Sequence, residues 1–187
     1  IMQRKFIVEQ QWELAKKNRE LLSLAFYDPM TLLYNRRKFE ELLRFELAAI
    51  RKAGHESCLI IVDIDHFKEI NDHYGHPFGD TVLKQVAAIL FENTRTTDAV
   101  SRWGGEEFLI LLPQTTLAGG KSTAEKLRRL IEENNHIVKD EKVYVTASFG
   151  VTALKANPED SLSPSYRDVD QALYAAKRNG RNQVEAL

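Results

Sequence analysis

The clearest indication of the fold is a run of apolar residues that ends in two acids, CLIIVDID at positions 58–65. The five consecutive apolar residues 58–62 are typical of a buried β-strand, which delivers Asp63 and Asp65 at its end. Two carboxylates placed two residues apart project to the same face of an extended chain. They repel each other unless a cation joins them, and Mg²⁺ suits such hard oxygen ligands. The alternative is a pair of solvated loop acids, or caps for a helix that starts at His66.

Helices and strands alternate on both sides of this strand. We expect helices over about 36–53, up to residue 70, and over 79–93, 117–134 and 168–179, and strands over 100–103, 108–112 and 143–149. Gly54 can end the first helix in the left-handed conformation, and Gly104-Gly105 suit a tight hairpin turn. Residues 157–165, with two Pro and three Ser, predict a mobile loop. This order predicts an α/β fold with a central, mostly antiparallel sheet flanked by helices.

The first 27 residues are expected to form a separate unit. Residues 1–26 contain no Gly or Pro and many strong helix formers, so we expect an N-terminal helical stalk over 1–27 and a domain over 28–187. Its apolar residues follow coiled-coil spacing with two polar interruptions, Lys5 and Arg19. An amphipathic helix packed on its own domain is an equal alternative. Because Ile1 precedes Met2, we also expect the chain to be a fragment of a longer protein.

Composition excludes several classes of protein. The 187 residues include 26 basic and 27 acidic side chains, a net charge of −1, which argues against a nonspecific grip on duplex nucleic acid. Cys58 is the only cysteine, which excludes an intramolecular disulfide and a multi-cysteine zinc cage and favours a reducing compartment. The sequence has no apolar run of about 18 residues, and we expect no signal peptide because its start has neither a basic-then-apolar pattern nor a small-residue cleavage site. We therefore expect a cytoplasmic domain, with a membrane anchor upstream in the parent protein left open.

Two further acids, Glu106 and Glu107, directly follow the glycine pair and are expected at the hairpin tip. If the hairpin lies beside the strand that ends at Asp63, three or four carboxylates surround one cavity. That arrangement is typical of two-metal sites for phosphoryl or nucleotidyl transfer. The alternative is that both are exposed turn acids.

Five ordered blocks of the sequence resemble the GGDEF family of diguanylate cyclases. They are DPMTLLYNRR at 28–37, DIDHFKEIND with GHPFGD at 63–80, RWGGEEF at 102–108, SFGV at 148–151 and DQALYAAKRNGRN at 170–182. The third block has the family's GGEEF spelling, and Met30 replaces a usual Leu. The resemblance implies a fold similar to the palm of polymerases and nucleotidyl cyclases. It also implies an enzyme that condenses two GTP into cyclic di-GMP and two pyrophosphates, by attack of a 3′-hydroxyl on an α-phosphate.

The resemblance implies a metal site and catalytic residues. Asp63, the Ile64 carbonyl and Glu106 would hold Mg²⁺, with Mn²⁺ as the alternative ion, and Glu107 could hold a second ion. Glu106 is also the family's usual candidate for accepting the proton of the 3′-hydroxyl, although a metal-bound carboxylate is a poor base. Lys68 would face the triphosphate and stabilise charge in the transition state.

The resemblance also implies residues that bind the substrate. Asn71 and Asp80 would read guanine, whose N1–H and 2-amino donors suit an ionised carboxylate and are lacking in adenine. His76 lies in the same block. Lys177 and Arg181 are spaced i, i+4, so they could share one face at a helix end and bind the β- and γ-phosphates. As alternatives, Asn71 and Asp80 would be helix caps, and the two cations would only favour the helix dipole.

Arg95 and Asp98 resemble the family's R-x-x-D site, where the product inhibits the enzyme. An exposed ion pair is the alternative. The family further implies a homodimer, because each domain holds one GTP, and an upstream sensor that the stalk would connect to the domain. Two rival functions are a catalytically silent receptor for GTP or cyclic di-GMP, and a Mg²⁺-dependent nucleotidyltransferase that acts on another substrate.

Overall fold

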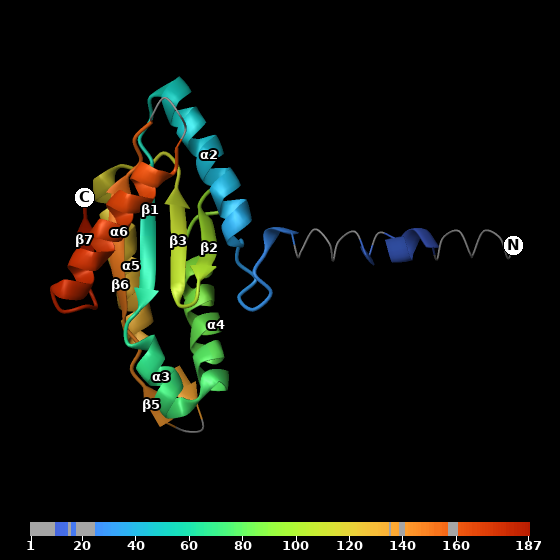
Figure 1. Ribbon diagram of the computed structural model, residues 1–187, viewed down its shortest axis with the longest axis vertical. Coiled ribbons are helices and arrows are strands. Elements are labelled where there is room, and N and C mark those ends of the chain that lie inside the picture. The colour runs from blue at the N-terminus through green and yellow to red at the C-terminus, as the bar shows by residue number, and fades with distance from the viewer. Residues whose placement is uncertain (1–9, 15, 18–24, 135, 139–140, 157–160) are drawn as a thin grey trace, which may run out of the picture.

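A five-stranded sheet flanked by helices forms the body of the protein (Figure 1). The computed structural model describes residues 10–14, 16–17, 25–134, 136–138, 141–156 and 161–187. The helices are α2 (Arg36–Ala53), α3 (Phe67–Tyr74), α4 (His76–Glu92), α5 (Leu117–Glu133) and α6 (Ser163–Arg178). The strands are β1 (Cys58–Ile64), β2 (Ala99–Gly104), β3 (Glu107–Leu112), β4 (His136–Val138), β5 (Glu141–Val143), β6 (Ala147–Ala153) and β7 (Val184–Ala186).

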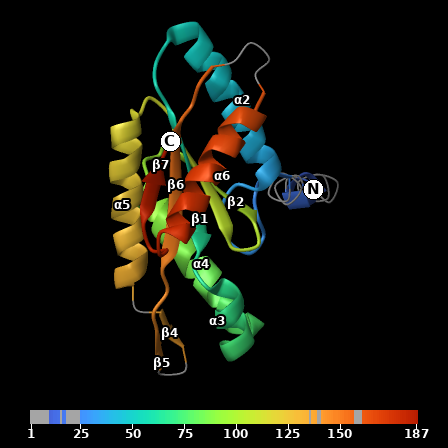
Figure 2. The same ribbon diagram turned by 60° about the vertical axis from the view of Figure 1, so that its left-hand side comes forward.

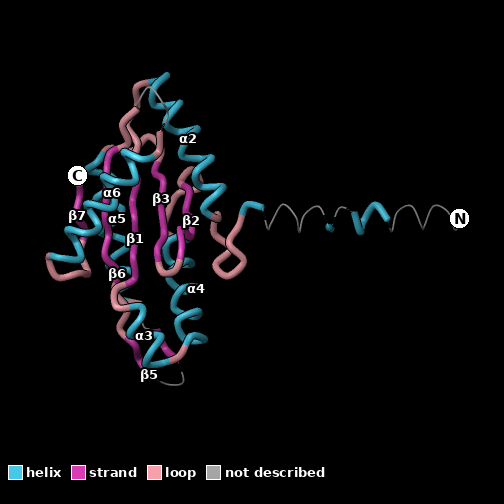
Figure 3. Tube along the Cα trace, viewed as in Figure 1, coloured by secondary structure: helices cyan, strands magenta, loops and turns pink. Residues whose placement is uncertain are grey.

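The sheet is mostly antiparallel, which confirms the predicted fold class. Its strand order is β2-β3-β1-β6-β7, and only the β6–β7 pair is parallel (Figure 3). β4 and β5 form a separate two-stranded hairpin. Strand β1 therefore lies in the middle of the sheet, with β3 on one side and β6 on the other. No helix within the described residues is long and apolar enough to span a membrane.

Strand β1 is buried along its whole length and divides the core into two layers. Cys58, Ile60 and Val62 pack with α4 and α5, whereas Leu59 and Ile61 pack with α2 and α6. Figure 2 shows α5 and α6 on opposite sides of the strands. Because side chains alternate along a strand, Asp63 falls on the face that α6 covers.

Helix α6 lies unusually close to the sheet at Gly150 of β6. A Cβ atom at Gly150 would lie 2.5 Å from the backbone nitrogen of Leu173 and 2.5 Å from the carbonyl oxygen of Val169. Any larger residue would push the helix away from β6. This contact fixes the distance between α6 and the end of β1.

The predicted helix over 36–53 is confirmed, and Gly54 ends it with a φ of 69°. Other predicted bounds are wrong. Helices α4 and α6 begin three and five residues earlier than predicted, at His76 and Ser163, because each accommodates a proline in its first turn. The short helix continues past residue 70 to Tyr74.

The predicted strand over 143–149 is also wrong, because residue 143 ends β5 and β6 begins only at Ala147. Tyr144 is exposed and Val145 is buried, so the segment between these strands alternates like a strand without being one. Residues 163–165 of the predicted loop belong to α6, and residues 157–160 lie outside the described residues. Most of the predicted stalk also lies outside them; residues 10–14 and 16–17 are helical.

Candidate active site

The end of β1 lies directly beside the acidic hairpin. In the strand register, Asp63 is opposite Glu107 of β3 on one side and Ser148 of β6 on the other. The backbone N–H of Ile64 donates to the carbonyl oxygen of Glu106 at 3.4 Å. The hairpin therefore lies beside the strand that ends at Asp63, and the structure brings Asp63, Glu106 and Glu107 together.

A lysine lies against these acids. The ammonium Nζ of Lys177, in the last turn of α6, is 2.8 Å from Oδ2 of Asp63, whose side chain is only 9% exposed. Burial raises the pKa of Asp63, the Lys177 ion pair opposes that rise, and the nearby Glu106 and Asp65 charges add to it. Burial and the charge of Asp63 likewise raise the pKa of Glu107. These carboxylates are crowded in a half-buried site, which favours the approach of a cation.

The donor set suits a hard cation that is shared with a substrate. Among the described residues, no three His, Cys, Asp or Glu side chains converge as a ready-made metal cage. Mg²⁺ typically binds one or two protein carboxylates and completes its shell with water and phosphate oxygens. The Asp63 and Glu106 carboxylates with the Ile64 carbonyl match that habit, so these residues fit the ion that the resemblance implies.

The second acid at the strand end, Asp65, accepts hydrogen bonds from the protein. Its Oδ1 accepts from Ser148 Oγ at 2.7 Å, and its Oδ2 accepts from Thr146 Oγ1 at 2.8 Å and from the backbone N–H of Asn182 at 3.0 Å. Both oxygens are thus engaged by protein donors. Asp63 and Asp65 therefore do not act as an equivalent pair, and Asp65 joins β1, the start of β6 and the loop after α6.

The hairpin turn lies one residue later than predicted. Gly104 is the last residue of β2 and pairs with Glu107, so Gly105 and Glu106 form the turn, with a φ of 50° at Gly105. The guanidinium of Arg102 grips this turn, since its Nε and Nη2 donate to the carbonyl oxygen of Gly105 at 3.1 and 2.9 Å. Glu106 is therefore held at the tip by the backbone immediately before it.

Sequence reasoning gave no role to the contact between Arg102 and Asp28. Nη1 of Arg102 lies 3.4 Å from Oδ1 of Asp28, which also accepts from the backbone N–H and the hydroxyl of Thr31. Burial alone would raise the pKa of Asp28, but the Thr31 hydrogen bonds and the Arg102 charge outweigh burial and lower it. The chain entering the domain is thus tied to the acidic turn. The sequence signal for this contact was a charged residue at the start of each of two separate motifs, Asp28 and Arg102.

The cap alternatives for the two guanine-reading candidates are wrong. Helix α3 continues three residues past Asn71 to Tyr74, and α4 begins at His76, so Asp80 lies inside a helix. A Cβ atom at Gly79 would lie 1.9 Å from Oδ1 of Asn71. The side chain of Asn71 therefore packs directly against the glycine that precedes Asp80, and both side chains are half-buried.

The two remaining candidate phosphate-binding cations, Lys68 and Arg181, lie on different elements. Lys68 is exposed on the first turn of α3. Helix α6 ends at Arg178, so the prediction that Lys177 and Arg181 share one helix face is wrong. Arg181 lies in the loop after α6, is exposed, and has a left-handed φ of 63°.

Arg95 and Asp98 lie at a separate cavity. The backbone N–H of Arg95 donates to Oδ2 of Asp98 at 2.8 Å. Oδ1 of Asp98 is buried without a hydrogen-bond partner among the described residues. The cavity of about 540 Å³ is lined by both residues and by Tyr27, Leu32, Tyr34 and Phe91, among others. It thus offers an exposed guanidinium, an unsatisfied carboxylate oxygen and aromatic walls.

Comparison with known proteins places these features in a family context. Residues 25–183 match the family model described as diguanylate cyclase, GGDEF domain. The chain is 42% identical to diguanylate cyclase DgcP of Pseudomonas aeruginosa over 86% of this chain and 24% of that protein. It is 38% identical to diguanylate cyclase A of Treponema denticola, over 91% of this chain and 47% of that protein. The chain therefore spans about a quarter to a half of the length of these curated relatives.

Solved structures give the same result. The coiled coil and GGDEF domain of DgcB from Caulobacter crescentus, in complex with c-di-GMP, superposes with a TM-score of 0.88 at 30% identity, covering 96% of this chain and 95% of that one. Diguanylate cyclase SiaD from Pseudomonas aeruginosa, solved with its activator SiaC, has a TM-score of 0.84 at 36% identity, covering 98% and 70%.

Proposed function

This chain belongs to the GGDEF family, and from that membership we propose that it is a diguanylate cyclase domain, which condenses two GTP into cyclic di-GMP and releases two pyrophosphates. The observation that carries the proposal is the meeting of Asp63 with Glu107 and Lys177 at the end of β1. Carboxylates and an ammonium in one site suit a metal-bound triphosphate.

The metal site in this proposal is formed by the Asp63 and Glu106 carboxylates and the Ile64 carbonyl, with Glu107 available to a second ion. When bound, Mg²⁺ or Mn²⁺ would neutralise phosphate charge and lower the pKa of the attacking 3′-hydroxyl. Glu106, at the turn, is also the candidate acceptor of that proton. The buried position of Asp63 strengthens its interaction with any cation, since nearby water is reduced.

The protein's own cations would hold the triphosphate. Lys177 already lies 2.8 Å from Asp63, so its ammonium is available to a phosphate group that binds beside the acids. Lys68 and Arg181 would contact the remaining phosphate oxygens from α3 and from the loop after α6. Positive groups that are fixed in place before the reaction stabilise charge that develops on the leaving pyrophosphate.

Guanine would be selected by Asn71 and Asp80, with His76 at the start of α4 beside them. The carboxylate of Asp80 can accept from guanine N1–H and the 2-amino group, and the Asn71 amide can donate and accept. Adenine would leave the half-buried carboxylate unpaired, which costs about 1–3 kcal/mol for each lost partner. GTP is therefore expected to be preferred to ATP.

Catalysis would require two copies of the domain, because each copy holds one GTP and the two must meet face to face. In this proposal residues 1–27 are the stalk that pairs the copies and connects an upstream sensor to residues 28–187. The structural relative DgcB, solved as a coiled coil with a GGDEF domain, supports this arrangement.

The decisive experiment is to incubate the purified chain with Mg²⁺ and GTP, or with ATP, and to quantify cyclic di-GMP by chromatography. A version fused at its N-terminus to a dimeric leucine zipper controls for weak dimerisation. We expect product from GTP and none from ATP, and faster turnover in the tethered dimer. Binding of GTP or cyclic di-GMP without product, even in the tethered dimer, would instead identify a silent receptor. Preference for ATP would contradict the guanine site.

The cavity beside Arg95 is the proposed site of product inhibition. Arg95 could donate to guanine O6 and N7 or to phosphate, and the unpartnered Oδ1 of Asp98 could accept from guanine N1–H. Tyr27 and Tyr34, which are stacked with ring centroids 5.3 Å apart, would contribute an aromatic wall.

We expect Arg95→Ala to raise the concentration of cyclic di-GMP needed for half-inhibition by about tenfold to a hundredfold, since charged hydrogen bonds contribute roughly 1.5–3 kcal/mol each. Initial rates with added product provide the measurement. Lys84→Ala, which removes an exposed cation from the middle of α4 and outside the cavity, should leave inhibition unchanged. Equal inhibition of Arg95→Ala and the wild type would exclude this cavity as the site.

A further inference from the structure

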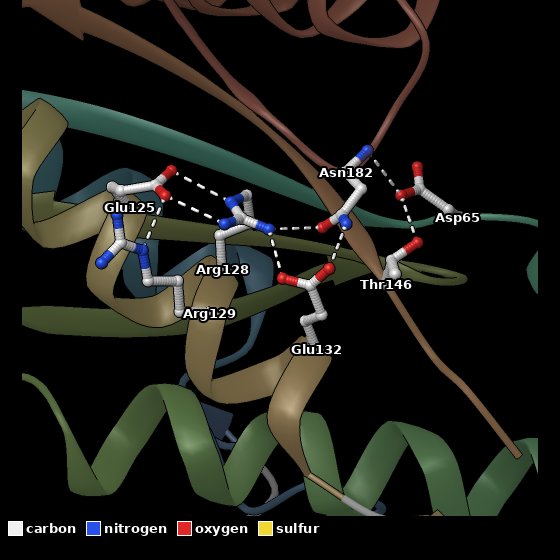
Figure 4. A network of polar contacts seen from close by, with 7 residues as sticks. All are labelled: Asp65, Glu125, Arg128, Arg129, Glu132, Thr146 and Asn182. Atoms are coloured by element: carbon white, nitrogen blue, oxygen red, sulfur yellow. Dashed lines mark hydrogen bonds and ion pairs between the residues drawn. The ribbon is translucent and has the colours of Figure 1, made fainter.

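A network of hydrogen bonds and ion pairs joins α5 to the loop after α6 and to the strand end (Figure 4). Nη1 of Arg128 donates to Oδ1 of Asn182 and to Oε2 of Glu132, both at 2.8 Å. Nδ2 of Asn182 donates to Oε1 of Glu132 at 2.7 Å, and its backbone N–H donates to Asp65. Asn182 is thus held through its backbone by Asp65, directly after β1, and through its side chain by α5.

The loop that Asn182 ends has an unfavourable backbone. Gly180, Arg181 and Asn182 have φ values of 117°, 63° and 45°, so three successive residues lie in the left-handed region. Glycine adopts such angles freely, whereas a residue with a Cβ atom does so at a cost. Arg181 and Asn182 therefore need contacts that hold them. One is the N–H of Arg181, which donates to the carbonyl oxygen of Ala176 at 3.0 Å.

The guanidinium of Arg128 is largely engaged by partners within the protein. Its Nε and Nη2 donate to the two oxygens of Glu125 at 3.0 and 2.9 Å, so with its Nη1 bonds it makes four hydrogen bonds within the protein. Its side chain is 13% exposed. The neighbouring Arg129 also pairs with Glu125 but is 65% exposed and does not reach Asn182.

We propose that Arg128, Glu132 and Asn182 are positioning residues, which fix the Gly180–Asn182 loop and thereby the phosphate-binding cations relative to the metal-binding acids. The loop carries Arg181 and directly follows the end of α6 that carries Lys177. At the other end of the network, Asp65, two residues beyond Asp63, accepts a hydrogen bond from the backbone N–H of Asn182. One connected set of bonds therefore sets the separation between the anionic and cationic halves of the site. This inference rests on the proposed function, because the phosphate contacts of Lys177 and Arg181 are part of that proposal.

The test compares Arg128→Met with Arg129→Met. Methionine keeps the helix and the apolar stem of each side chain, so the two variants differ in whether the link to Asn182 is lost. Binding of α,β-methylene GTP in the presence of Ca²⁺, measured by calorimetry, reports the phosphate site without turnover. We expect about tenfold weaker binding in Arg128→Met and a change of less than about twofold in Arg129→Met, by the loss of one or two hydrogen bonds.

A second readout does not depend on the nucleotide. Hydrogen exchange at the amide of Asn182, which donates to Asp65, should become at least about tenfold faster in Arg128→Met and stay unchanged in Arg129→Met. Asn182→Gly serves as the second variant, because it removes the side-chain link while adopting the left-handed backbone freely. It should reproduce both effects of Arg128→Met.

A double variant separates positioning from general damage. If Arg128 acts through the loop, Arg128→Met combined with Arg181→Ala should bind the analogue no more than about twofold more weakly than Arg181→Ala alone. If the two substitutions weaken analogue binding independently and additively, the inference is overturned. It is also overturned if a variant with faster hydrogen exchange at residue 182 binds the analogue normally. Unchanged exchange in both Arg128→Met and Asn182→Gly, with a wild type that forms product, overturns the inference alone. A wild type that binds no analogue and forms no product overturns the proposed function, while the exchange comparison still tests the network.

Discussion

Glu106→Gln should lower the rate of cyclic di-GMP formation about a thousandfold, which corresponds to about 4 kcal/mol of transition-state stabilisation. Glutamine keeps the size of the side chain but has no negative charge, so it binds a divalent cation poorly and cannot accept the proton of a 3′-hydroxyl. Glu106 lies in the turn after Gly105, outside both core clusters, so the fold should not depend on it.

Initial rates of product formation in the zipper-tethered dimer provide the measurement, and thermal unfolding checks the fold. Glu133→Gln, an exposed charge change at the end of α5, is the matched control and should keep full activity. Glu106→Gln should still bind cyclic di-GMP at the Arg95 cavity, because the two sites do not share residues. A variant that retains more than a tenth of wild-type activity would show that Glu106 is neither a necessary ligand nor the base.

The second large effect is expected from a single methyl group. Gly79→Ala should weaken GTP binding about a hundredfold, because the new Cβ would lie 1.9 Å from Oδ1 and 2.9 Å from Cγ of Asn71. The carboxamide of Asn71 must then rotate away from α4, and the contacts with guanine that we propose for it would be lost. Two such hydrogen bonds in a half-buried site are worth about 2–3 kcal/mol in total.

Calorimetry with α,β-methylene GTP measures this loss, and a double variant tests its cause. Asn71→Ala removes the group that the methyl displaces, so Gly79→Ala should add little in that background. A further large loss in the double variant would mean that the methyl acts elsewhere, for instance on Phe67, whose Cζ would lie 3.2 Å away. Normal binding by Gly79→Ala would remove Asn71 from the guanine site.

The sequence was sufficient to predict those elements that are determined by residues close together along the chain. The apolar run at 58–62 predicts the central strand, and Gly54 marks the end of α2, because both depend on neighbouring residues. The starts of α4 and α6 were missed because Pro77 and Pro164 look like helix breakers, although a proline in the first turn lacks only a hydrogen bond that is not made there. Strand β7 has three half-buried residues, too few to show a period.

The candidate site divides in the same way. Motif resemblance indicated that Asp63, Glu106 and Lys177 belong together, and the structure brings them together. The use of Asp65 could not be predicted, because its partners Thr146 and Asn182 are 81 and 117 residues away along the chain. Only the sheet register and the strained loop place these donors beside one carboxylate.

If the cavity beside Arg95 binds the product as proposed, its walls have a consequence for feedback. Tyr27, Leu32 and Tyr34 come from the segment that enters the domain before α2, whereas Arg95 and Asp98 come from the turn before β2. A ligand that binds between them stabilises one placement of the entering segment. By thermodynamic reciprocity, the factor by which the ligand changes the binding of an input to this segment is also the factor by which that input changes the affinity for the ligand. The sensitivity to product is then not a fixed property of the domain, because whatever acts on the entering segment sets it.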